Sequence, residues 1–286
     1  MIKYWLTCIY LFAVYSTNAQ IEYAESVYAS GNYELAGVEY ERLIFLNSDY
    51  NLRNQAILGK VESLKQLGKF NEAYSTSLRG NTYTQDSSTN DRLRYESVLC
   101  AYLAERYNDS YNQFKQLEYF STNNQLVDAS RVVAALSLNE LGRWNEAKDI
   151  MASLKVKYDL GIDVNKLYHP RDYPKIRDVK KQQFSLALFP SFVMVREGEV
   201  TSGFASMLLK AFVLSYNVYH LLNGYYLNAL VAGGTYALLY MGSTSQAGDA
   251  LIINNNRKLQ NYNSNLRNQI LQSIEKNNKQ LSLNPF

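Results

Sequence analysis

The chain has 286 residues, which is enough for one or two domains. Its 29 Lys and Arg residues nearly balance 26 Asp and Glu residues, and a net charge of +3 excludes a dedicated nucleic-acid binder. Two Cys and two His residues exclude a disulfide scaffold, a structural zinc site and a multi-histidine metal centre. A hydrophobic content of 47% with only 4 Pro and 14 Gly residues predicts an ordered, all-α protein.

Residues 1–19 are typical of a secretory signal peptide. Lys3 precedes an apolar run over residues 4–15, and small residues follow up to Ala19. Twelve apolar residues form a helix of about 18 Å, whereas the hydrocarbon core of a bilayer is about 30 Å thick. This length favours a cleaved signal over the alternative of a retained membrane anchor, so we expect an exported protein.

Four short strings follow with a period of 37 residues. They begin at Gly31, Gly68, Glu105 and Gly142, and each has an aromatic residue two positions later and a small residue five positions later. The first position predicts a turn with positive φ, and the small residue lets two helices approach closely. Residues 20–160 are therefore predicted to form about four helical hairpins.

These strings resemble the tetratricopeptide repeat family, whose pattern is Gly-x-Tyr-x-x-Ala-x-x-x-Tyr and whose usual period is about 34 residues. The resemblance covers about residues 20–158 and implies a solenoid with a concave, protein-binding surface. In this family the first helix of each repeat lines that surface. Mapping by the period places seven partner-binding candidates there: Tyr28, Glu62, Lys65, Arg92, Tyr95, Tyr102 and Asn139. The alternative for each of them is an ordinary solvated helix face.

Residues 161–183 are expected to form a basic linker. They contain six Lys or Arg residues against three Asp residues, and Pro170 and Pro174 disfavour helices. The linker is expected to lead to a membrane or to a second packed domain.

Residues 184–241 contain three apolar segments with only four charged residues among them. We expect a membrane hairpin with spans over residues 203–222 and 225–241. The segment at 184–195 is too short to span and is expected to re-enter the membrane or to lie at its interface. The alternative is a buried pair of soluble helices, because the middle of this region is rich in Tyr and Asn.

Four residues of this region are candidate membrane-site residues. Lys210 lies inside the second segment, either snorkelling to the interface or serving as a functional cation. Pro190, Gly198 and Gly203 resemble part of a motif in exported bacterial envelope proteins of unknown function, which join helical repeats to a membrane region. The resemblance implies the same architecture and location.

Residues 242–286 form a polar tail in which apolar residues recur at three- and four-residue spacing, which predicts an amphipathic helix. The tail is expected either to lie on an anionic bilayer or to dock on the repeats.

The sequence offers little evidence of a catalytic or cofactor-binding site. Neither His169 nor His220 has a nearby acid or nucleophile, and no metal-binding, phosphate-binding or nucleophile motif occurs. We therefore expect neither enzyme activity nor a cofactor.

The sequence instead predicts a membrane-anchored scaffold that holds envelope proteins in its repeat groove. Its expected location is the bacterial inner membrane with the repeats in the periplasm, and the outer membrane is the second choice. The alternative function is a membrane-embedded transport or lipid-handling component with the repeats as a docking arm.

Overall fold

The computed structural model describes residues 20–80 and 86–277, and every regular element in these ranges is a helix. The predicted all-α fold is thus confirmed for this part of the chain. The chain divides into two compact units, one of which runs to His169 and resumes at Leu266, while the other is Pro170–Asn265. The predicted signal peptide at residues 1–19 lies outside the described residues.

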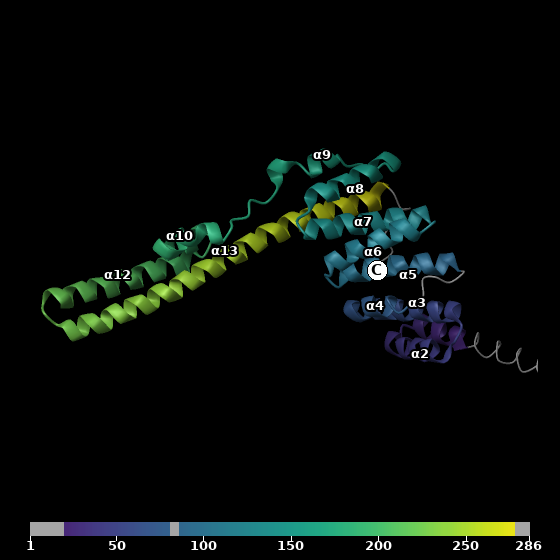
Figure 1. The fold of residues 1–286 in the computed structure, drawn as a ribbon, viewed down its shortest axis with the longest axis horizontal. Helices are drawn as coiled ribbons and strands as arrows, with labels where there is room; N and C mark the ends of the chain where they lie inside the picture. The colour runs from purple at the N-terminus through teal and green to yellow at the C-terminus, as the bar shows by residue number, and fades with distance from the viewer. Residues whose placement is uncertain (1–19, 81–85, 278–286) are drawn as a thin grey trace, which may run out of the picture. The chain divides into compact units, whose positions relative to one another are not determined.

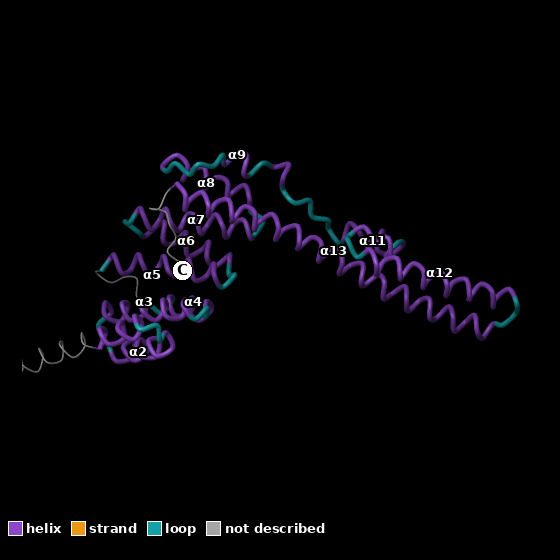
Figure 2. The backbone as a smooth tube through the Cα atoms, turned by 180° about the vertical axis from the view of Figure 1, so that it is seen from behind, coloured by secondary structure: helices purple, strands orange, loops and turns teal. Residues whose placement is uncertain are grey.

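The first unit is a stack of helices, each of which packs on the next in the chain (Figures 1 and 2). In addition, α3 packs on α5 and α5 packs on α7, so that these three helices form a continuous layer. A helix over residues 20–29 opens the unit. It is followed by α2 (Tyr33–Leu46), α3 (Tyr50–Gln66), α4 (Phe70–Ser77), α5 (Ser87–Leu103), α6 (Tyr107–Phe120), α7 (Asn124–Glu140), α8 (Trp144–Lys157) and α9 (Val164–Leu167).

The 37-residue period is visible in the backbone. Gly31, Gly68 and Gly142 have φ angles of 83°, 70° and 72°, and Glu105 at the equivalent position has a φ of 59°. A residue in this left-handed conformation ends the preceding helix, and glycine adopts it at no steric cost. The turn is therefore kept even in the one repeat where glycine is missing.

A second set of residues fixes where the first helix of a repeat begins. Asp49, Asp86 and Asn123 are 37 residues apart and cap α3, α5 and α7, each of which has 17 residues. Their side-chain oxygens accept hydrogen bonds from backbone N–H groups two or three residues later. These caps satisfy N–H groups that the helix itself leaves unpaired.

The small residues of the repeats lie where helices approach each other. Ala36, Ala73, Ser110 and Ala147 are all fully inaccessible to solvent. Ser110 is tolerated there because its hydroxyl donates a hydrogen bond of 2.9 Å to the carbonyl oxygen of Val98.

The second unit consists of short helices followed by a helical hairpin. These are η1 (Pro170–Asp172), η2 (Lys180–Gln182), α10 (Gln183–Leu188), α11 (Pro190–Arg196), α12 (Val200–Leu222) and the 52-residue α13 (Tyr226–Asn277). Figure 1 shows α12 and the first part of α13 side by side, joined by a turn that includes Gly224. The boundary expected at residue 241 falls inside α13, whose last part belongs to the first unit.

The predicted transmembrane spans are not supported by the structure. The segments at 203–222 and 225–241 are helical, but no helix of the described residues is long and apolar enough to cross a membrane. The reason is that the scarcity of charge does not imply high hydropathy. Lys210 and a run of Tyr, Asn and His side chains separate the apolar residues in these two helices.

Candidate functional site

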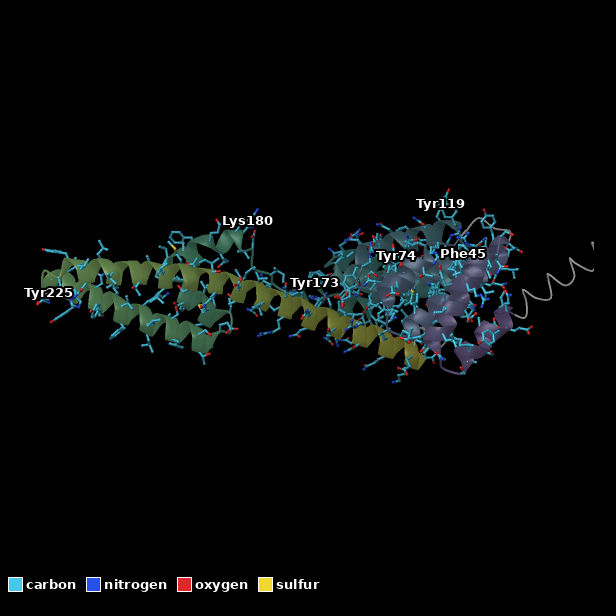
Figure 3. The ribbon with its side chains drawn as sticks, turned by 90° about the horizontal axis from the view of Figure 1, so that it is seen from below. Phe45, Tyr74, Tyr119, Tyr173, Lys180 and Tyr225 are labelled. Carbon is cyan, nitrogen blue, oxygen red and sulfur yellow. The ribbon has the colours of Figure 1, made fainter. Side chains whose placement is uncertain are left out.

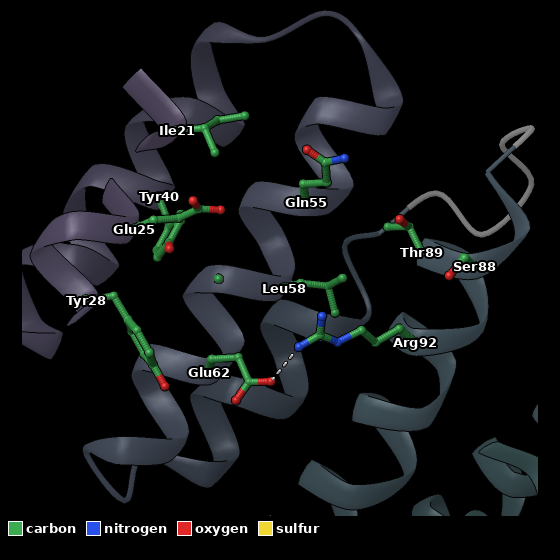
Figure 4. Close-up of a pocket in the computed structure, with 11 residues that line it drawn as sticks. Ile21, Glu25, Tyr28, Tyr40, Gln55, Leu58, Glu62, Ser88, Thr89 and Arg92 are labelled. Carbon is green, nitrogen blue, oxygen red and sulfur yellow. Dashed lines mark hydrogen bonds and ion pairs between the residues drawn. The ribbon is translucent and has the colours of Figure 1, made fainter. Parts of the chain in front are cut away.

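A cavity of about 380 Å³ opens between the first helices of three successive hairpins (Figure 4). Its lining mixes carboxylates, phenol rings, a guanidinium group and small polar side chains with two aliphatic ones. The lining comes from the helix over residues 20–29 and from α2, α3 and α5. The lining residues are Ile21, Glu25, Tyr28, Tyr40, Gln55, Leu58, Gly59, Glu62, Ser88, Thr89 and Arg92.

Three of the seven residues predicted for the concave surface meet in this cavity. Glu62 projects between Tyr28 and Arg92 in Figure 4, and one of its oxygens lies 3.3 Å from a guanidinium nitrogen of Arg92. The period therefore brings residues of three different repeats to a single place. Glu25 and Gln55 line the same cavity and were not among the seven predicted residues.

Lys65 contacts Glu62 but is not one of the residues that line the cavity. Its ammonium nitrogen lies 2.8 Å from a Glu96 oxygen and 3.1 Å from a Glu62 oxygen, and its side chain is only 3% exposed. Burial lowers the pKa of Lys65, but the two carboxylates outweigh burial and raise the pKa above its ordinary value. Lys65 is thus a buried charge that holds the Glu62 side chain in place, and it does not line the cavity itself.

Tyr40 enters the cavity because Gly59 leaves room for its ring. A Cβ atom at Gly59 would lie 2.3 Å from Cζ of Tyr40. Burial, followed by the Glu25 carboxylate, raises the pKa of the Tyr40 hydroxyl to about 12, so the hydroxyl stays protonated at neutral pH. Gly59 and Tyr40 are 19 residues apart in the sequence, and no local sequence pattern indicates that they are in contact.

The remaining predicted groove residues lie elsewhere. Tyr95 is 7% exposed and belongs to a hydrophobic core with Phe114 and Leu117. Asn139 is buried, and its amide nitrogen lies 3.0 Å from the hydroxyl oxygen of Tyr168. The period gives the correct helix for both residues, but their side chains point into the core.

Tyr102 lies next to the last part of α13. In this region Arg267 forms an ion pair of 3.9 Å with Glu140. Burial raises the pKa of Tyr102 above its ordinary value, and the nearby Arg267 offsets only part of that rise. Leu266, Ile270 and Ile274 of the same helical segment are buried. Their four-residue spacing is that of one face of a helix, and this part of the tail belongs to the first unit.

The motif residues of the second unit have structural roles. Pro190 is the first residue of α11, where its missing N–H group costs nothing. Gly198 has a φ of 104° and makes the turn to α12, and Gly203 packs against α11 so closely that a Cβ would lie 2.8 Å from the carbonyl oxygen of Ser191. The segment expected over 184–195 is therefore two short helices that meet at Phe189.

Polar groups pair with one another inside the hairpin. Lys210 donates a hydrogen bond of 3.0 Å to Ser243 and lies 5.6 Å from the ring centroid of Tyr240. The amide of Asn217 donates one of 3.0 Å to the carbonyl oxygen of Ala229. Lys210 is thus used to join the two helices.

The outward surface of the hairpin is apolar. Its most exposed large side chains are between 71% and 83% exposed, and they are Leu208, Phe212, Leu222, Tyr226, Leu227, Leu230 and Leu238. The sequence has no Asp, Glu, Lys or Arg residue between Lys210 and Asp249. Polar groups inside and apolar groups outside are the reverse of the usual arrangement in water.

Groups of His, Cys, Asp or Glu residues that would hold a metal ion are absent from residues 20–80 and 86–277. Comparison with known proteins finds no matching family model, curated protein or solved structure. The assignment of a function therefore depends on the cavity and on the hairpin.

Proposed function

We propose that this chain is a membrane-associated scaffold of the bacterial cell envelope, whose repeats hold partner proteins in the groove around Glu62. The observation that carries the proposal is the open cavity in which side chains from three successive helical hairpins converge. Stacked helical repeats use such surfaces to bind peptides and helices. The proposed periplasmic location rests on the predicted signal peptide.

Membrane association is supported by the arrangement of side chains in the hairpin. Lipid offers no hydrogen bonds, so helices in contact with it pair their polar groups internally and turn apolar groups outward. The bonds of Lys210 and Asn217 and the exposed Leu208 and Phe212 follow this rule. We propose contact between this outer surface and a bilayer.

The alternative of a transport or lipid-handling component depends on Lys210 as a functional cation. A pathway through a membrane normally shows several ionisable residues that face it. The hydrogen bond from Lys210 to Ser243 gives this residue a structural use instead. The scaffold is therefore the function we favour.

Membrane contact predicts that the double variant Leu208→Glu, Phe212→Glu no longer binds lipid. The two side chains are 72% and 71% exposed, so the fold tolerates the change, whereas two carboxylates strongly disfavour an apolar lipid environment. In flotation with vesicles of phosphatidylethanolamine and phosphatidylglycerol, we expect the wild-type chain to float and this variant to remain in the unbound fraction.

The matched control for flotation is Phe45→Glu, Tyr119→Glu in the first unit. These side chains are 87% and 82% exposed and are labelled in Figure 3. The control adds the same charge and removes as much exposed apolar surface, so we expect it to float like the wild type. Equal loss of flotation in both variants would show that total charge and not the hairpin surface decides binding.

The scaffold function predicts that a photo-crosslinker at Ser88 captures a distinct partner in native membranes. Ser88 is exposed and lines the cavity, whereas Ser153 on α8 is exposed outside it. We expect a crosslinked species from position 88 that is absent from position 153 and that is lost with Tyr28→Ala. The same species from both positions, or from neither, would contradict binding in the groove.

A further inference from the structure

We propose that the cavity beside Glu62 receives a basic side chain, that of an arginine or a lysine, from the partner protein. This inference deepens the proposed function, since it rests on the groove being a protein-binding surface. The surrounding charges, rings and aliphatic side chains each fit such a group.

The charges of the cavity favour a cation. Glu25 and Glu62 line it, and Arg92 is the only basic residue among the lining residues. Lys65 contacts Glu62 but is also held by Glu96, which offsets its charge. In the part of the chain that the structure describes, Glu25 forms no ion pair, so its carboxylate is available to a ligand.

Arg92 does not block a second cation. Its side chain is 58% exposed and its contact with Glu62 is 3.3 Å long, which is the geometry of a weak, solvent-screened pair. A guanidinium group of the partner can therefore displace Arg92 from the Glu62 carboxylate at little cost. An acidic side chain, by contrast, would meet two carboxylates and an arginine that is already paired.

The other walls fit the shape of an arginine or a lysine. Figure 4 shows Tyr28 and Tyr40 on one side of the cavity, and aromatic rings attract a cation placed over their faces. Ile21 and Leu58 provide aliphatic surface for the methylene stem of the side chain. A volume of about 380 Å³ is near the lower limit for ligand pockets, which suits one long side chain better than a helix.

The test compares two probes that differ in charge but hardly in shape, N-acetyl-arginine methylamide and N-acetyl-citrulline methylamide. Binding to the full chain is followed by NMR of labelled Ile and Leu methyl groups, because Ile21 and Leu58 line the cavity. We expect the arginine probe to shift the Ile21 and Leu58 signals and the citrulline probe to leave them unchanged at the same concentration. Equal shifts with both probes, or none with either, would overturn the inference.

Two single variants test whether the arginine probe binds at the carboxylates of the cavity. We expect Glu25→Gln to weaken binding of the arginine probe by up to about fivefold, the upper end of the range for a solvent-accessible ion pair. Glu22→Gln removes the same charge from the same helix at an exposed position outside the cavity and is expected to leave binding unchanged. Equal weakening by both variants would mean long-range attraction and would overturn a specific site.

The outcome is separable from that of the scaffold proposal. A groove-specific crosslink from Ser88 without preference for the arginine probe would retain the scaffold and reject the basic side chain. Preference for the arginine probe without any crosslinked partner would retain the chemistry of the cavity and reject the scaffold.

Discussion

Replacing Lys65 with methionine is expected to destabilise the first unit by about 3–5 kcal/mol, the usual cost of leaving a buried charge without its partner. The side chains of Lys65 and Glu96 are 3% and 5% exposed, and their charged atoms are 2.8 Å apart. Lys65→Met leaves the Glu96 carboxylate among apolar atoms with no cation in contact. Urea unfolding followed by circular dichroism measures the loss.

Two further variants separate the buried charge from lost packing. Lys60→Met, on the same helix, removes a lysine whose partner Glu41 is 41% exposed, and we expect less than about 1 kcal/mol. The double variant Lys65→Met, Glu96→Leu is expected to recover most of the stability, because an apolar pair avoids desolvation of two charges. Failure of the double variant to recover stability would show that the ion pair is not what the Lys65 variant loses.

The loss also depends on pH with a definite sign. Burial already raises the pKa of Glu96 in spite of Lys65, and removal of the lysine raises it further. A carboxyl group with a raised folded-state pKa binds its proton more tightly in the folded state than in the unfolded state. The deficit of Lys65→Met is therefore smallest below the unfolded pKa of about 4.3 and grows as the pH rises through the folded-state value.

The helices of the repeats were predictable because local chemistry recurs. Gly31, Gly68 and Gly142 mark turns where φ is positive, and Asp49 and Asp86 mark helix starts at the same interval. Each of these residues acts on backbone groups within three or four positions. Such short-range effects are readable from one sequence.

The side-chain environments were less predictable because they depend on contacts between distant segments. Tyr95 and Asn139 occupy helices of the repeats as expected, yet Tyr95 packs in a core with Phe114 and Leu117, and the Asn139 amide is buried against the hydroxyl of Tyr168. Tyr102 meets Arg267, which is 165 residues away in sequence. A repeat period defines which helix a residue belongs to, but not which neighbouring segment covers it.

The length of α13 could not be predicted from the composition of its segments. The polar tail and the preceding apolar segment differ in composition, but both have helical propensity and no proline interrupts residues 226–277. A change from apolar to polar side chains does not interrupt the backbone hydrogen bonds of a helix, so α13 continues through the boundary expected at residue 241. Gly242 and Gly248 lie within it at helical positions.

Gly203→Ala is expected to loosen the packing of α11 on α12 by about 1–3 kcal/mol, the usual cost of adding a methyl group to a tight contact. The new Cβ would lie 2.6 Å from Cγ2 of Val195 and 2.8 Å from the carbonyl oxygen of Ser191. The second atom belongs to the backbone, so rotation of a side chain cannot relieve the contact and the helices must separate. Hydrogen exchange of peptides from α11 and α12 is expected to become faster.

Gly242→Ala is the matched control in the same hairpin. Gly242 lies within α13, is exposed, and has no atom within 4 Å of the position of a Cβ. Alanine there gains helix propensity worth about 0.5–1 kcal/mol with no steric cost, so hydrogen exchange in α13 is expected to slow. If Gly203→Ala slowed exchange in the same way, helix propensity would outweigh the contact with Ser191. In that case close packing would not explain why glycine stands at residue 203.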